Sequence, residues 1–229
     1  MKIYLKEILI ITSVLFFLGA SGLAVSASEN EESQNLTDVE LQELNQAKKD
    51  TQYFLNNPDA IKVETNSKDV KADEEPISAQ SSGVVGSVGD VLVTLDGTSS
   101  GSSSWAGGHA GIVYSSQVVL ESFGNKGAQN GVRYWPNDWG TRYNDVTGVR
   151  PKGSPSRADY VNAKNYANAQ ELEPYNYNFF NKDVTYRWYC SQLAYKAWDE
   201  QGYDIDDGGL AVWPVDLIQS NNTYVFYTQ

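Results

Sequence analysis

The spacing of apolar residues changes several times along the chain, and each spacing predicts a different element. The first pattern is an apolar run over residues 8–25, which follows two lysines and ends at small residues. This arrangement is typical of a secretory signal peptide. A membrane anchor is the competing interpretation, but the run is short and is interrupted by Ser and Gly. We therefore predict a signal peptide over residues 1–27 and a mature protein without a stable membrane anchor.

A helix and a polar linker are predicted next. Thr37 and Glu40 have the spacing of a capping box, which predicts a helix that runs to about Leu55. Residues 60–82 carry many charges and few large apolar side chains, so we expect them to be flexible. We predict that residues 28–82 form an acidic helical leader with a linker. A spacer, a propeptide and a wall-facing arm all remain open as its role.

Short strands with alternating or β-branched residues begin at residue 89. GDVLVTLDG is typical of a strand that ends at an Asp-Gly turn, and a Ser/Gly-rich loop follows it. HAGIVY and VVLESF then predict a β-hairpin with a three-residue connection. The rest of the chain predicts strands at 132–135 and 146–150, a helix at about 156–170, a helix that includes Cys190, a short helix from Pro214 and a closing strand, TYVFY.

The register of this hairpin can be predicted from its length. If residue 114 pairs with residue 118, then His109, Gly111, Glu121 and Phe123 point to the same side of the ribbon. His109 and Glu121 become diagonal neighbours, with Cβ atoms about 7–8 Å apart or somewhat less. An imidazole and a glutamate can bridge that separation.

The only cysteine of the chain lies at the start of a predicted amphipathic helix. In RWYCSQLAYKAW, apolar residues recur at positions 190, 193, 194, 197 and 198, which form one helical face. Free backbone N–H groups and the helix dipole at this end favour a thiolate. This helix by itself favours core packing of Cys190 over catalysis, because free cysteine behaves as a small, usually buried hydrophobe. A catalytic role requires a base from elsewhere in the chain.

The only histidine can supply that base. A Cys–His pair is the minimum apparatus for acyl transfer by a thiol, because the imidazole takes the thiol proton and later protonates the leaving amine. The hairpin register offers Glu121 as the group that fixes the imidazole tautomer. Separately, His109 and Glu121 each suit an ordinary structural role. Together with Cys190 they favour a catalytic site.

Composition excludes several other classes of function. The net charge is -12; residues 28–80 hold 13 acidic and 5 basic side chains, and residues 81–229 hold 15 and 10. A nucleic-acid partner would call for clustered Lys and Arg, so none is predicted. One cysteine excludes an internal disulfide, so stability must come from a core, which about 200 mature residues can form.

No metal or other cofactor is predicted. One histidine and one cysteine would leave a zinc site dependent on carboxylates. The acidic turn DIDDGG, residues 204–209, lacks the spacing and the terminal bidentate Glu of an EF-hand loop.

Several motifs carry a resemblance to a known family. GDVLV, GGHAGIVY, VLESFG with GVRYWP, and YCSQLAYKAW together resemble the permuted papain-like amidases of the YiiX/YaeF type, within the NlpC/P60 superfamily. The resemblance covers most of residues 84–229, and the order of His before Cys matches the permuted branch. It implies an α+β, permuted papain-like domain over residues 83–229, in which a small antiparallel sheet is packed by helices. It also implies Cys190 as nucleophile, His109 as base and Glu121 as orienting residue.

The remaining predictions concern the surroundings of these three residues. The backbone N–H of Cys190 is the first candidate oxyanion donor, and Tyr189 is a candidate for a second. Trp105, in the Gly-rich loop, is the best aromatic candidate for substrate contact. Asp90 belongs to the GD motif, and a structural turn suits it at least as well as a role in the site.

We therefore predict an exported cysteine hydrolase or amidase, a monomer that is secreted or associated with the cell wall. Export and the family resemblance favour peptide amide bonds of the cell envelope as substrate. Two alternatives are an amidase or acyltransferase that acts on lipid-linked or small amides, and a non-catalytic envelope-binding module.

Overall fold

The computed structural model describes residues 36–64, 83–97 and 107–229. The predicted signal peptide, most of the predicted linker and Trp105 lie outside the described residues. The division into a signal peptide, a leader and a domain from residue 83 therefore stays a prediction. Among the described residues, no helix combines the length and the apolar character needed to cross a membrane.

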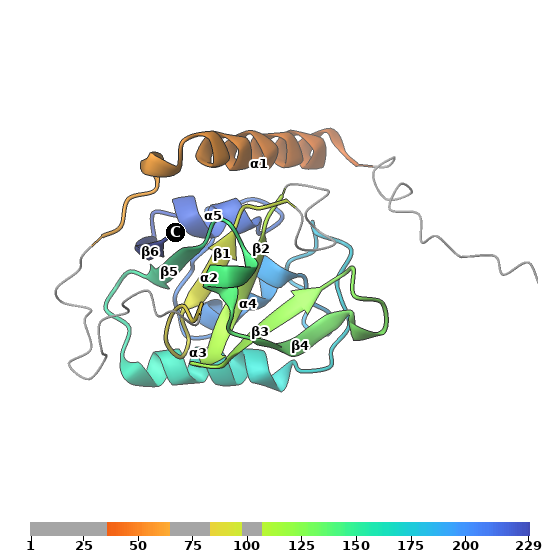
Figure 1. Cartoon of the computed structure of the whole chain (residues 1–229). Coiled ribbons are helices and arrows are strands. Elements are labelled where there is room, and N and C mark those ends of the chain that lie inside the picture. Colours follow the sequence, from red (N-terminus) through yellow and green to blue (C-terminus); the bar gives the residue numbers. More distant parts are fainter. Residues whose placement is uncertain (1–35, 65–82, 98–106) are drawn as a thin grey trace, which may run out of the picture. The chain divides into compact units, whose positions relative to one another are not determined.

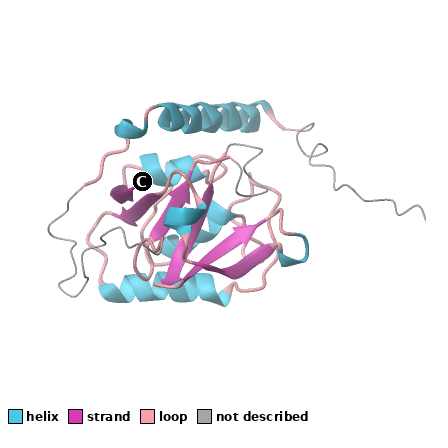
Figure 2. Cartoon of the chain, in the orientation of Figure 1, coloured by secondary structure: helices cyan, strands magenta, loops and turns pink. Residues whose placement is uncertain are grey.

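The described part of the chain contains one six-stranded antiparallel sheet with the strand order β4-β3-β2-β1-β5-β6 (Figures 1 and 2). With its helices, this sheet confirms the α+β class. The strands are β1 Val91–Thr94, β2 His109–Ser115, β3 Val118–Phe123, β4 Gly131–Pro136, β5 Thr147–Pro151 and β6 Thr223–Thr228.

Two longer helices begin at the capping boxes that their sequences contain. Thr37 and Glu40 exchange hydrogen bonds at the start of α1, Asp38–Asn56. Ser156 and Asp159 do the same at the start of α3, Arg157–Ala169. The predicted leader helix is thus confirmed. The other helices are α2 Trp139–Arg142, α4 Cys190–Asp199 and α5 Pro214–Gln219, with 3-10 turns η2 Pro58–Ala60 and η4 Gly127–Gln129.

Apolar side chains cover both faces of the sheet, so β1 is buried on both sides. Val91 and Val93 belong to the main core, which also contains the apolar stripe of α4 and side chains of α3 and α5. Leu92 belongs to a second cluster, with Trp139 and Tyr143. The aliphatic and aromatic residues of the central strands therefore fix the sheet between two packed layers.

The predicted hairpin register is confirmed where it concerns the site. Gly111 lies opposite Glu121, and Ile112 opposite Leu120. The connection differs from the prediction, because β2 continues to Ser115 and leaves two residues between the strands. The register shifts between residues 113 and 115, so a bulge takes up the extra residue.

The leader helix packs against the rest of the described chain. Leu44 and Ala47 of α1 are buried and belong to the main hydrophobic core. Beyond the helix, Val63 forms an isolated bridge with Val225 of β6. The composition of the leader did not predict these contacts.

Candidate active site

His109 and Glu121 form a buried pair on the hairpin. His109 is the first residue of β2, and Glu121 lies within β3. The Nε2 atom of His109 lies 2.8 Å from Oε2 of Glu121, and both side chains are fully buried. The predicted diagonal placement thus produces a direct hydrogen bond that orients the imidazole.

Gly111 leaves the room that the Glu121 side chain occupies. A Cβ atom at position 111 would lie 2.7 Å from Cγ1 of Val119 and 2.9 Å from Cγ of Glu121. Such contacts are too short, so a side chain at position 111 would displace the glutamate. This glycine is needed for space, since its backbone conformation is an ordinary strand conformation.

The second carboxylate oxygen of Glu121 is held by α2. Oε1 accepts hydrogen bonds from Nε1 of Trp139, at 3.1 Å, and from the Arg142 guanidinium, at 2.6 Å. Arg142 also contacts Oδ1 of Asp138 at 3.0 Å. A buried carboxylate needs hydrogen-bond partners, and Trp139 and Arg142 satisfy the oxygen of Glu121 that does not contact the imidazole.

Sequence reasoning missed Trp139 and Arg142. The available signal was the segment 138–142, in which an acid and a base lie four positions apart. A buried glutamate beside a histidine also demands a countercharge. Neither signal indicates which of the basic side chains of the domain supplies it.

Cys190 is the first residue of α4, as predicted, and it is 1% exposed. The backbone N–H of Tyr189, the residue before Cys190, donates to the side-chain oxygen of Gln192 at 3.2 Å. This hydrogen bond fixes the start of the helix. The buried apolar stripe of the helix holds it against the sheet. The thiol is therefore placed where the N–H groups and dipole of α4 stabilise a negative charge.

The His109 imidazole interacts with both Glu121 and Cys190. Burial lowers the pKa of His109, but the hydrogen bond and charge of Cys190, followed by those of Glu121, raise it from 6.5 to about 8. Since Nε2 is taken by Glu121, Nδ1 is the nitrogen available to the thiol. Cys190 and Glu121 together therefore favour the protonated form of this imidazole.

Aromatic rings hold the imidazole in this orientation. The ring of Phe123 stacks on that of His109 with centroids 4.2 Å apart, and the ring of Trp139 stacks at 5.7 Å. Tyr143 lies at 6.4 Å with a tilted ring. The packing limits rotation of the imidazole.

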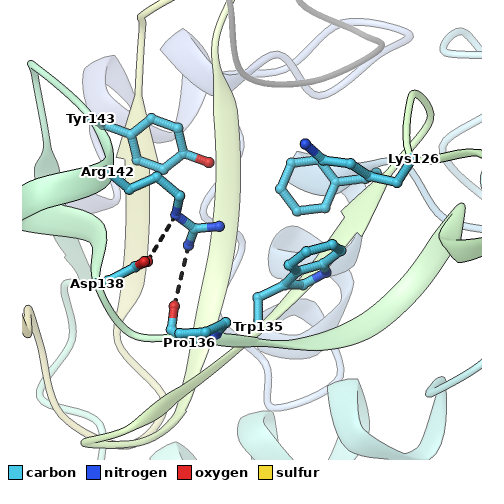
Figure 3. Close-up of a pocket in the computed structure, with 7 residues that line it drawn as sticks. Lys126, Trp135, Pro136, Asp138, Arg142 and Tyr143 are labelled. Atoms are coloured by element: carbon cyan, nitrogen blue, oxygen red, sulfur yellow. Dashed lines mark hydrogen bonds and ion pairs between the residues drawn. The ribbon is translucent and has the colours of Figure 1, made fainter.

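A pocket of about 470 Å³ adjoins these rings (Figure 3). Figure 3 shows Arg142 and Lys126 on different sides of it, with Arg142 linked to Asp138 and to the Pro136 carbonyl. Burial, with the charges of Glu121 and Cys190 among the further causes, raises the pKa of Tyr143, so this pocket wall lies within electrostatic reach of Cys190. The complete lining is Phe123, Lys126, Trp135, Pro136, Asp138, Arg142 and Tyr143.

The other predicted residues have different placements. The buried Tyr189 hydroxyl accepts a hydrogen bond from the N–H of Val212 at 3.0 Å, and its role as an oxyanion donor stays a prediction. Trp105 lies outside the described residues. Asp90 forms two hydrogen bonds with Arg150, at 2.7 and 2.8 Å, which fits its structural interpretation.

Metal-ligating side chains do not gather in the described part of the chain. No group of three or more His, Cys, Asp or Glu side chains there has an arrangement that could hold a metal ion.

The chain is similar in structure to a solved protein, although its sequence matches no family model. No family model matches the chain, and no curated protein matches it. Among solved structures, the chain is similar to the crystal structure of metalloprotein yiiX from Escherichia coli O157:H7, with 16% sequence identity and a TM-score of 0.48. The match covers 62% of this chain and 97% of that chain. It is a structure of the YiiX type that the sequence motifs resemble.

Glu121→Gln is expected to reduce turnover by about 10- to 100-fold, because a hydrogen bond to a charged group contributes about 1.5–3 kcal/mol. Glutamine retains an acceptor for the imidazole but loses the charge that stabilises imidazolium. Glu121→Ala should lose more, since Trp139 and Arg142 would also lack their acceptor.

Initial rates of the two Glu121 variants and of wild type test this expectation, with folding checked by thermal melting. Glu200→Gln, an exposed change, serves as the matched control and should retain full activity. Full activity in both Glu121 variants would leave a Cys–His dyad and exclude Glu121 as the orienting group.

Proposed function

We propose that this protein is an exported cysteine hydrolase that cleaves amide bonds, with peptides of the cell wall as its substrate. The observation that carries the proposal is the fully buried hydrogen bond between Glu121 and His109, which leaves Nδ1 of His109 buried without a hydrogen-bond partner in the described part of the chain. The influence of Cys190 on the pKa of His109, which is raised to about 8, supports the same pairing. Burial without charged partners would lower the pKa of a histidine, because it disfavours the charged imidazolium. The hydrogen bond and charge of Cys190, together with those of Glu121, account for the opposite shift.

The geometry supports a two-step acyl transfer. The Cys190 thiolate attacks the amide carbonyl carbon, and the new oxyanion is stabilised by backbone N–H groups at the start of α4. The His109 imidazolium then gives its proton to the leaving nitrogen as the C–N bond breaks. In the second step, neutral His109 takes a proton from water, whose oxygen attacks the thioester and releases the acid and the thiolate.

The finer description of the fold is part of this proposal. In the sheet, His109 opens the second strand, whereas Cys190 opens a helix that follows the fifth strand. This order supports a permuted papain-like arrangement, in which the histidine strand precedes the nucleophile helix. The motif resemblance to the YiiX/YaeF type supports the same arrangement.

The proposed substrate and location rest on different observations from the chemistry. The apolar amino-terminal segment supports export, and the motif resemblance supports cell-envelope peptides, in a secreted or wall-associated monomer. The pocket lined by Phe123 and Tyr143 adjoins the His109 ring and would receive the part of the substrate next to the scissile bond.

The test is incubation of the mature protein with purified cell-wall fragments, followed by mass spectrometry of the released products. The proposal predicts fragments that differ from the starting peptides by one added water and one broken amide bond. The same assay with small amides and lipid-linked amides separates the alternative substrates. Release of no product from any of these, by protein with an intact fold, would contradict hydrolase activity on them.

A further inference from the structure

Residues 210–214, called here the wedge segment, contact the start of the nucleophile helix. The carbonyl oxygen of Val212 accepts a hydrogen bond from the Ser191 hydroxyl at 2.6 Å. The N–H of the same residue donates to the Tyr189 hydroxyl at 3.0 Å. Val212 therefore holds the two residues that flank Cys190 in the sequence.

The wedge segment also contacts the backbone that leads into His109. Gly108 has a φ of +86°, and a Cβ atom there would lie 3.0 Å from Cβ of Pro214 and 2.6 Å from the carbonyl oxygen of Thr94. Pro214, the last residue of the wedge segment, thus packs closely against the residue before His109. The segment connects the two halves of the candidate dyad.

The leader helix holds the wedge segment in place. The Glu43 carboxylate of α1 accepts hydrogen bonds from the N–H groups of Leu210 and Ala211, each at 2.8 Å. About two turns further along, buried Thr51 lies against Gly107, where a Cβ atom would be 2.9 Å from Cγ2 of the threonine. The helix thus contacts the wedge segment and the approach to His109.

Glu43 lies near other acidic side chains. Burial, followed by the charges of Asp206, Asp207 and Glu43 among the causes, raises the pKa of Asp216 well above its usual range. An acidic side chain in an acidic neighbourhood is unfavourable unless specific donors compensate it. The two backbone N–H groups of the wedge segment are those donors, which distinguishes Glu43 from an ordinary packing residue.

We propose that Glu43 is a positioning residue of the active site, and that the leader helix holds the wedge segment so that Cys190 stays aligned with His109. This inference rests on the proposed function, because it concerns the same two residues. It assigns the leader a role in activity, beyond those of a spacer or an arm. Misplacement of reacting groups by about 1 Å can reduce a rate by about 10²-fold, so a loosened wedge segment has a measurable effect.

The test uses the full mature chain with Glu43→Ala, Glu43→Gln and, as the control, Asp38→Asn, an exposed acidic residue of the same helix. Alkylation of Cys190, the only thiol, by iodoacetamide is followed by intact mass as a function of pH. Glu43→Ala should react about tenfold more slowly at pH 7, and its midpoint should move up toward the unperturbed value of about 8.5. Glu43→Gln should be affected less, because its side-chain oxygen still accepts one hydrogen bond.

Thermal melting separates positioning from folding. A merely structural role of Glu43 would lower the melting temperature and leave the alkylation midpoint of the folded protein unchanged. Suppose that the wild-type alkylation midpoint lies well below about 8.5, and that folded Glu43→Ala and Glu43→Gln have the same midpoint and rate as wild type. This result would overturn the inference about Glu43 and leave the proposed function intact. A wild-type midpoint near 8.5 would instead contradict the proposed function. If Glu43→Ala does not fold, Glu43→Gln decides between the outcomes.

Discussion

Cys190→Ala is expected to reduce turnover of wall peptides to the level measured without protein. The chain contains one thiol, and His109, Glu121 and their partners provide no other nucleophile for the acyl-enzyme step. Alanine is smaller than cysteine and fits the apolar environment at the start of α4, so the fold should persist. Product release measured by mass spectrometry gives the rate, and thermal melting gives the stability.

Cys190→Ser provides a second variant with a similar shape. Its hydroxyl ionises far less readily than a thiol, so this variant should also be almost inactive. Wild-type rates in either folded variant would exclude Cys190 as the nucleophile.

His109→Ala is expected to reduce turnover at neutral pH by about 10²- to 10⁴-fold, the usual contribution of general acid–base catalysis. The thiol would lose the imidazolium that stabilises its ionised form. The loss should shrink as the pH approaches about 8.5, where an unassisted thiol ionises by itself. Rates between pH 5 and 10 for wild type and His109→Ala measure this difference.

The double variant Cys190→Ala with His109→Ala tests whether the two residues act together. Its rate should equal that of Cys190→Ala, because residues of one catalytic unit are not additive. A His109→Ala variant with an unchanged pH–rate profile would show that the base lies elsewhere.

The central elements of the site could be predicted because their determinants are local. The alternation of HAGIVY and VVLESF fixes the hairpin register that sets Glu121 opposite Gly111. The apolar stripe of α4 likewise places Cys190 at a helix start. Only one histidine and one cysteine were available to pair, so no choice among candidates was needed.

The supporting contacts could not be predicted because they join segments far apart in the sequence. Arg142 reaches Glu121 across 21 positions, and Glu43 reaches Ala211 across 168. Local patterns identify an acidic helix in the leader but contain no information on its docking surface. The bulge beside Ser115 was missed for a related reason, since the pattern fixes which residues share a face and leaves the turn geometry undetermined.

The titration of His109 by nuclear magnetic resonance tests the central claim most directly, because the protein has a single histidine. The thiolate–imidazolium account predicts a pKa of about 8 in the wild type. It predicts a lower pKa in Cys190→Ala, where burial still disfavours the charge and only Glu121 remains to favour it. A wild-type pKa at or below 6.5, or one that Cys190→Ala leaves unchanged, would contradict the pairing of His109 with Cys190.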